Sequence, residues 1–459
     1  MRMKIKKKTL IASAGLSVLL SACVNLAPVQ PRPAAPTAKQ WAQPSAGADA
    51  AARLSWQNYY NDPRLRPMLQ IALDNNRDLR VAMLNVEQAR GLAGVTAASQ
   101  LPSLGVGAIA QLQPGSSGSL VNTYQAGLQL SAYEIDLFGK MRNQTDAATA
   151  RYLASSEGAR AARIALVAAV ASGYLVLQAD EEWLAIARKI WLTRQESQRL
   201  TQLRFDQGAA SSLDLVSSRT ALESSHAAVA QAERQRDQDE NALLLLLGQS
   251  LPADLLAATA LSEQRLVELP SGLPSEILAQ RPDVLQSEAQ LLAANANIGA
   301  ARAAFFPAIL LTSNLGTASS QLLGLFKNSV WTFVGQALLP VFDNGRNEAN
   351  LAAARAGREI ALAQYEKTVQ IAFREVADAL AGRTSFNLQM QALQAQAQAE
   401  AQRLALIELR FANGASNSLE LLDAQRASLA AEQALLQLRL GRLLNGVQQY
   451  KALGGGLIG

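Results

Sequence analysis

Apolar residues recur with helical spacing through two long intervals of the chain that contain no proline. The first interval covers 115–251 and the second covers 341–459. Because proline inside a helix removes a backbone hydrogen bond and clashes with the preceding turn, such intervals can hold very long helices. In the second interval an apolar residue recurs every seven positions, at Leu422, Leu429, Leu436, Leu443 and Tyr450. This heptad spacing predicts long helices that pack side by side as in a coiled coil.

The predicted helices are longer than a globular core requires. At ~1.5 Å per residue, a helix over about 143–204 would extend for about 90 Å. Many faces of the predicted helices are dominated by small and polar side chains, as in the segment "QMQALQAQAQAEAQ" at 389–402. Such a helix suits a wall with neighbouring helices on one side and water on the other. An alanine-rich coiled coil without a lumen is the alternative that helices alone leave open.

Alternation of apolar and polar residues predicts two β-hairpins, at about 103–136 and about 308–342. In "YQAGLQLSAYEID" at 124–136, Ala126, Leu128, Leu130 and Ala132 fall on one face and glutamine and serine on the other. One apolar and one polar face, on strands of ~10 residues, are typical of membrane β-barrels. Hairpins at the surface of a soluble periplasmic protein are the alternative. Four strands cannot close a membrane barrel and open edges are costly in lipid, so we expect the chain to oligomerise.

The two halves of the chain repeat one another. The segment "RFDQGAASSLDLVS" at 204–217 matches "RFANGASNSLELLD" at 410–423 at seven of fourteen positions, 206 residues apart. Two further pairs of segments match at offsets of 205 and 204. A period this long indicates a duplicated domain rather than a solenoid. We therefore predict a first structural repeat at 53–260 with a tip turn at about 204–215, and a second at 261–459 with a tip turn at about 410–421.

The N-terminus predicts export and lipid attachment. Residues 1–22 have a basic start, an apolar run and a small-residue end, as in a secretory signal. The ending "LSAC" resembles the lipobox of bacterial lipoproteins, which implies cleavage before Cys23 and lipid on that residue. An ordinary signal followed by an accidental cysteine is the alternative. Because Val24 rather than aspartate follows, the resemblance implies sorting to the outer membrane. Residues 23–52 are rich in proline and alanine and predict an extended tether.

Composition excludes several classes of function. Five of the 42 basic residues lie in the predicted signal, which leaves 37 against 37 acidic residues, so the basicity that would favour nucleic acid disappears. The chain has one cysteine and one histidine, His226, which argues against a metal cluster or a histidine-based catalytic triad. We therefore expect neither an enzyme nor a cofactor, apart from covalent lipid on Cys23.

Several motifs together resemble the outer membrane factor family, the TolC superfamily, and within it the lipidated OprM/MtrE-like branch. The resemblance implies a mainly α-helical protein with a membrane β-barrel: a homotrimer whose twelve strands form one barrel, continued by a twelve-helix periplasmic α-barrel. It also implies outer-membrane lipid, a periplasmic adaptor and an inner-membrane pump of the RND type as partners. Besides the lipobox, the motifs are "YEIDLFGK" at Tyr133, "RPDV" at Arg281, "ANANIGAARAAFFP" at Ala294, "FDNGR" at Phe342, "LELLDAQR" at Leu419 and "YKALGGG" at Tyr450.

The same resemblance assigns roles to the two tip turns. Carried over by motif, Leu419, Glu420 and Asp423 would line the closed periplasmic aperture. Ordinary solvated helix charge is the alternative for both acids, whose i, i+3 spacing puts them on one helix face. The adaptor would dock on the tips, at residues that the two repeats share: Arg204, Phe205, Gly208, Arg410, Phe411 and Gly414.

The predicted function is passive. The chain would be a gated exit duct in the outer membrane, through which drugs or other small toxic compounds leave after a pump and an adaptor deliver them. Ducts for metal efflux or for type I protein secretion remain alternatives, because substrate identity is not encoded in these features. A periplasm-spanning structural lipoprotein that conducts nothing is the alternative of a different class.

Overall fold

The computed structural model describes residues 25–29, 33, 54–114, 118–252, 255, 260–264, 266–267 and 275–455. The predicted signal peptide, Cys23 and most of the predicted tether lie outside these residues. The described residues belong to two compact units. One unit comprises the described residues up to position 35 together with Met83–Glu157 and Leu285–Thr368, and the other comprises those of Pro36–Ala82, Gly158–Val284 and Val369–Gly459. Each unit therefore draws on both halves of the sequence.

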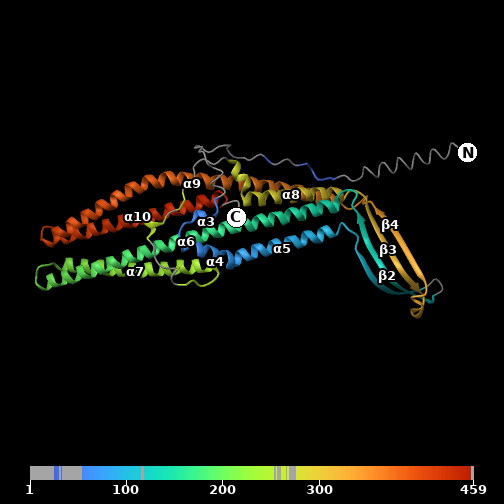
Figure 1. Ribbon diagram of the computed structural model, residues 1–459, viewed down its shortest axis with the longest axis horizontal. Coiled ribbons are helices and arrows are strands. Elements are labelled where there is room, and N and C mark those ends of the chain that lie inside the picture. Colours follow the sequence, from blue (N-terminus) through green and yellow to red (C-terminus); the bar gives the residue numbers. More distant parts are fainter. Residues whose placement is uncertain are drawn as a thin grey trace. The chain divides into compact units, whose positions relative to one another are not determined.

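Long helices dominate the chain, and its strands gather in one sheet (Figure 1). The helices are α3 (Trp56–Tyr59), α4 (Leu65–Asn75), α5 (Arg77–Ala98), α6 (Lys140–Asp206), α7 (Ser212–Leu247), α8 (Pro282–Ala303), α9 (Arg346–Ala412) and α10 (Ser418–Ala452). Three short 3₁₀ helices are η1 (Leu261–Glu263), η2 (Ser275–Gln280) and η3 (Leu322–Gly324). The strands are β1 (Leu104–Pro114), β2 (Leu120–Ile135), β3 (Ala308–Ser319) and β4 (Ser329–Leu338).

The predicted duplication is confirmed in the helices. Helices α6 and α9 are each 67 residues long. Two residues after each helix comes a glycine in the left-handed region, Gly208 or Gly414, with the same φ of 73°. The glycines that precede the two helices, Gly139 and Gly345, also have positive φ angles, 74° and 78°. The repeats thus share backbone geometry as well as sequence.

In each repeat, an equivalent side-chain hydrogen bond links the helix that precedes the strands to the end of the last helix, but the donor residue differs. In the first repeat the amide of Asn76 donates to the carbonyl oxygen of Leu246 at 2.8 Å. In the second, the guanidinium of Arg281 donates to the carbonyl oxygen of Ala452, also at 2.8 Å. These hydrogen bonds fasten the start of α5 to the end of α7 and the start of α8 to the end of α10.

Arg281 is buried and its charge is balanced by two carboxylates. Its guanidinium forms two hydrogen bonds with Asp283, at 3.0 and 2.7 Å, and one with Glu375 at 2.8 Å. Burial disfavours the charge of Arg281, but the bonds to Asp283 and Glu375 outweigh it and raise the pKa of the guanidinium above its usual range. The "RPDV" motif therefore builds an ion-pair node that ties α8 to α9 and α10.

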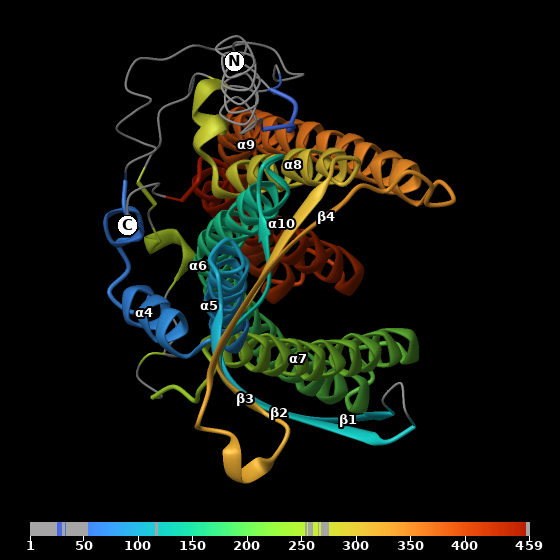
Figure 2. The same cartoon turned by 90° about the vertical axis from the view of Figure 1, so that its right-hand side faces the viewer.

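The four strands form one antiparallel sheet in the order β1-β2-β3-β4 (Figure 2). Each outer pair is a hairpin from one repeat, whereas the central pair, β2 with β3, joins the two repeats. Among the described residues, β1 and β4 each have a strand partner on one side only. The sheet therefore has two free edges, as the prediction of an incomplete barrel requires.

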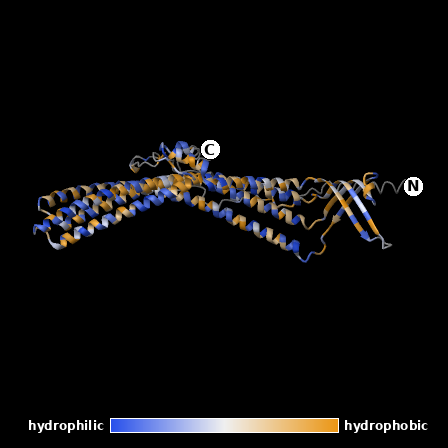
Figure 3. Cartoon of the chain, turned by 90° about the horizontal axis from the view of Figure 1, so that it is seen from below, coloured by the Kyte–Doolittle hydropathy of each residue, from blue (hydrophilic) through white to orange (hydrophobic). Residues whose placement is uncertain are grey.

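The register separates an apolar face of the sheet from a polar one. Figure 3 shows apolar and polar positions alternating along the strands. One row across the sheet is apolar and consists of Val106, Leu128, Leu315 and Trp331. The neighbouring row, which points to the opposite face, consists of Gly105, Gln129, Asn314 and Thr332. Trp331 is 75% exposed, which suits a face that contacts lipid.

The expected place of Ala132 on the apolar face is wrong, because β2 contains a bulge. The register with β3 shifts between Leu130 and Tyr133, so two residues of β2 oppose Thr312 alone. Ala132 has a φ of 47°, and its amide donates to the Thr312 hydroxyl at 3.2 Å. Since a bulge offsets the alternation by one, Tyr133 takes the place on the apolar face that the simple pattern gave to Ala132.

The unit that contains the tip turns has an aromatic core. The rings of Tyr59 and Tyr450 stack with centroids 4.4 Å apart, and Tyr60 meets both edge-on. The Tyr450 hydroxyl donates to the carbonyl oxygen of Leu54 at 3.0 Å. These contacts fasten α3, which precedes the first repeat's long helices, to the end of α10.

One helix of the described part, α6, includes a stretch of 18 residues that is apolar and long enough to cross a membrane, judged by length and composition alone. Half of that stretch is buried against other parts of the protein. Val170, Tyr174 and Leu177 of α6 are almost fully buried. Packing against other parts of the protein therefore explains why these residues are apolar, and contact with a membrane is not needed to explain it.

Candidate gate and docking tips

Both tips are built by the same helix-ending motif. In the first, the Ala209 amide donates to the Arg204 carbonyl oxygen at 2.8 Å and the Gly208 amide to that of Phe205 at 2.9 Å. The second tip repeats both bonds, from the amides of Ala415 and Gly414 to the carbonyl oxygens of Arg410 and Phe411, at 2.8 and 3.1 Å. This pattern requires a left-handed residue after the helix, and glycine adopts that conformation without strain.

Side-chain contacts join the two tips. The guanidinium of Arg204 lies over the ring of Phe411, 4.8 Å from its centroid, which is a cation–π arrangement. The Ser418 hydroxyl donates to a carboxylate oxygen of Asp214. Hydrogen bonds from Ser418 and from Ser211 hold the pKa of Asp214 below its usual range. Two docking residues predicted from sequence therefore meet each other, one from each repeat.

The three predicted gate residues lie in the first two turns of α10. Leu419 is 74% exposed, which is unusual for leucine and leaves it available to contact another chain. The Glu420 amide is capped by Asn417 at 2.8 Å, and its carboxylate accepts from the Ser416 hydroxyl. The carboxylate of Asp423 accepts from the guanidinium of Arg403 at 2.5 Å. Both gate acids thus form hydrogen bonds within their own chain, and Asp423 shares the Arg403 guanidinium with Glu400.

The remaining predicted docking residues lie on the two tip turns, whereas the predicted lipidation site lies outside the described residues. The ring of Phe205 is 37% exposed on the first tip. The Arg410 guanidinium donates to the carbonyl oxygen of Ala415 at 3.0 Å, so it reinforces the turn of its own tip. Cys23 lies outside the described residues, and the roles of all these residues stay predictions.

Sequence reasoning missed Arg403, the partner of Asp423, although a signal was present. In an antiparallel helical hairpin, residues at equal distances from the turn face one another. Arg403 and Asp423 are each ten positions from Asn413. The equivalent positions of the first repeat are Ser197 and Ser217, so only the second tip carries this ion pair. The two tips therefore share their backbone geometry but differ in their charged side chains.

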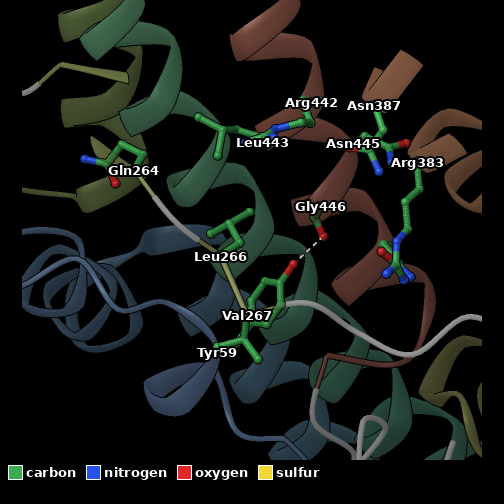
Figure 4. Close-up of a pocket in the computed structure, with 11 residues that line it drawn as sticks. Tyr59, Gln264, Leu266, Val267, Arg383, Asn387, Arg442, Leu443, Asn445 and Gly446 are labelled. Carbon is green, nitrogen blue, oxygen red and sulfur yellow. Dashed lines mark hydrogen bonds between the residues drawn. The ribbon is translucent and has the colours of Figure 1, made fainter. Parts of the chain in front are cut away.

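A separate cavity of about 280 Å³ lies away from the tips, between α9, α10 and residues Gln264, Leu266 and Val267 (Figure 4). The Tyr59 hydroxyl forms part of its wall and donates to the Gly446 carbonyl oxygen at 2.8 Å. None of the residues that the sequence predicted as functional lines it. The lining residues are Tyr59, Gln264, Leu266, Val267, Arg383, Asn387, Arg442, Leu443, Asn445, Gly446 and Gln449.

A sheet with two free edges, followed in each repeat by a helical hairpin, defines the class of TolC-like outer-membrane channels. The chain belongs to the outer membrane efflux protein family, whose model matches it twice, at residues 68–249 and 273–455. The two matches fall one in each repeat. The family is one of outer-membrane channels rather than of enzymes.

Relatives cover almost the whole chain. The antibiotic efflux pump outer membrane protein ArpC of Pseudomonas putida is 42% identical, over 98% of this chain and 96% of its own length. The toluene efflux pump outer membrane protein TtgC, also of Pseudomonas putida, has the same identity and coverage. Among solved structures, the open state of the MtrE outer membrane channel of Neisseria gonorrhoeae is 38% identical, with a TM-score of 0.86 over 95% of this chain and 99% of that one.

Proposed function

We propose that this protein is the outer-membrane exit duct of a tripartite efflux system and conducts small, predominantly apolar organic compounds such as antibiotics and solvents. The observation that carries the proposal is the four-stranded sheet with two free edges and one apolar face. Such a sheet is stable in a membrane only when other copies complete the barrel. Three chains would supply twelve strands around one lumen. The substrate class rests on relatives named for antibiotic and for toluene efflux.

Assembly with other proteins would use the two tips. The exposed Phe205 ring and the Arg204–Phe411 contact offer an aromatic and cationic surface suited to the tip of a helical adaptor. An inner-membrane pump of the RND type would then deliver substrate through that adaptor. Leu419, Glu420 and Asp423 would narrow the periplasmic aperture at rest, with Arg403 balancing Asp423.

Lipid on Cys23 would add a second attachment to the outer membrane. The support is the sequence "LSAC" directly after the apolar run of the signal. Two or more acyl chains bind a bilayer firmly, whereas one does so marginally. Intact mass of the mature chain tests this part alone, and an unmodified N-terminus would exclude it.

Three measurements together test the duct. Purified protein in a planar bilayer should carry ion current, and native mass spectrometry should find three chains. Expression in cells that lack their own efflux channel should restore resistance to toluene and to apolar antibiotics, with an empty vector as control. Absence of current from inserted trimers would favour the non-conducting lipoprotein. Current without restored resistance would favour a duct for metals or for secreted protein.

A further inference from the structure

Residues 25–29 lie against α8, far from them in sequence (Figures 1 and 2). Two side chains of the helix hold this segment, which we call the strap. The guanidinium of Arg302 donates to the carbonyl oxygen of Leu26 at 3.0 Å. The amide of Asn295 donates to the carbonyl oxygen of Pro28 at 2.8 Å. The strap also fixes its own turn, because the Ala27 amide donates to the Asn25 side chain at 3.0 Å.

The two donors form one site on one face of the helix. Asn295 and Arg302 are seven positions apart, which is about two helical turns, so both side chains project in the same direction. Asn295 is only 8% exposed, whereas Val29, at the end of the strap, is 99% exposed. Both acceptors are backbone carbonyl groups. The site therefore recognises an extended main chain rather than particular strap side chains.

The order of the contacts gives the strap a direction. Leu26 meets Arg302 near the end of α8, and Pro28 meets Asn295 two turns earlier. The chain before Leu26 therefore starts from the end of α8 that leads into β3 at Ala308. Cys23 is three residues before Leu26, and three residues reach at most about 11 Å. Whatever is attached to Cys23 is thus kept close to the base of the strands.

The duplicated helix serves as an internal comparison. Helix α5 is the counterpart of α8 in the first repeat, at an offset of 205 residues. Its residues at the two donor positions are Arg90 for Asn295 and Ala97 for Arg302, and both are exposed. Arg90 lies 4.0 Å from Glu87 on the same helix. Among the described residues, the pair of donors is therefore specific to α8.

We propose that Asn295 and Arg302 are positioning residues that hold the strap and thereby fix where the lipid anchor enters the outer membrane. The proposal rests on lipidation of Cys23, which belongs to the proposed function. The described part of each chain has one strap site, so a trimer would carry three anchors at equal spacing around the base of the barrel. The anchor is then a fixed part of the channel's contact with the membrane rather than the end of a free tether.

The test places a label in the strap and removes the donors. Ala27→Cys introduces a thiol between the two bonded carbonyl groups, and a spin label there gives one distance between the three copies of a trimer. In the otherwise unchanged protein, purified as the trimer, we expect a narrow distance distribution. Arg302→Ala and Asn295→Ala should each broaden it. They should also raise the rate of thiol modification at position 27 about tenfold, the change expected when a hydrogen bond to a charged or buried donor is lost.

Matched controls separate docking from folding and from lipidation. Arg90→Ala changes the equivalent position on α5 and should leave the distance distribution narrow. Arg302→Ala should disturb folding less than Asn295→Ala, because Arg302 is half-exposed. Distances are compared only between proteins that form trimers. Equally broad distributions with and without the donors would overturn the proposal. If protein without an added cysteine reacts with the thiol reagent, the Cys23 thiol carries no lipid and the anchor role fails, whereas docking of the strap is still decided by the distances.

Discussion

A close approach of strands β2 and β3 predicts a graded effect of alanine substitutions at the glycines of the sheet. A row of glycines crosses three strands: Gly107 on β1, Gly127 on β2 and Gly316 on β3. A Cβ atom added to Gly316 would lie 2.1 Å from the Ala126 carbonyl oxygen, and one added to Gly127 would lie 2.5 Å from the Cα atom of Gly316. Since both obstacles are backbone atoms, a side-chain rotation cannot relieve either clash.

The size of the effect follows from these distances. For an alanine at Gly316 to reach ordinary contact, strands β2 and β3 must separate by about 1.3 Å, which disturbs hydrogen bonds in strands normally spaced ~4.8 Å apart. Overpacking of this kind costs about 1–3 kcal/mol per site. A trimer contains three copies, so the total is about 3–9 kcal/mol, enough to lower the temperature of trimer dissociation by several degrees.

The same sheet supplies the controls. A Cβ atom on Gly105 meets nothing within 4 Å, and one on Gly335 meets a leucine methyl group at 3.7 Å. An added Cβ on Gly107 meets only the flexible end of Gln129, at 2.9 Å, so its cost is intermediate. Heating purified trimers and counting intact ones by native mass spectrometry should rank the alanine variants as 105 and 335, then 107, then 127 and 316. If Gly316→Ala trimers survive heating as well as Gly105→Ala trimers, the close approach of the strands is not a constraint.

Four further predictions concern other parts of the chain. Arg403→Gln removes the cation that balances the second-tip acid, so single-channel recordings should show stronger cation selectivity and a changed resting conductance; identical recordings would place the aperture elsewhere. Gly414→Val puts a β-branched residue at a φ of 73° and should weaken adaptor binding in a surface binding assay while leaving the trimer intact. Burial, and then the neighbouring Asp239, raises the pKa of Asp180 to about 7. Ionisation of this acid therefore disfavours the folded state increasingly as the pH rises from about 4 to 7. The Asp180→Asn variant should have a higher melting temperature than the parent at pH 8 and the same one at pH 4, and a gain independent of pH would contradict this. Arg281→Met leaves two carboxylates without their cation and should lower the free energy of unfolding by about 3 kcal/mol. A melting temperature equal to that of the parent would show that the node is dispensable.

Much of the architecture could be predicted because it depends on repetition and periodicity. The proline-free intervals predicted where the long helices lie, and the matching tip sequences predicted the duplication. The alternation of side chains located both hairpins. Pairing of β2 with β3 was not predicted, because it joins segments about 180 residues apart that no local pattern connects. Ala132 shows the same limit, since alanine has no preference for a positive φ and only the opposing Thr312 reveals the bulge.

The sequence predicted which segments contain the candidate site, but not which of its residues contact one another. Motif resemblance led to Asp423, whereas Arg403 follows only when the hairpin is folded back on its turn. The cation–π contact of Arg204 with Phe411 pairs one tip with the other, although each residue was predicted as part of its own tip. The strap site on α8 had no sequence signal, because its partners are backbone carbonyl groups more than 260 residues away.

The free edges of the sheet also bear on the order of events when the protein is made. A single chain can pair all four of its strands, but β1 and β4 still present unpaired backbone groups. One or two chains inserted in lipid would keep two such edges, and each unpaired group there costs several kcal/mol. In the proposed trimer, only the third chain removes both edges at once. Biogenesis should therefore be all-or-none, with chains associating before or during insertion and no long-lived inserted monomer or dimer.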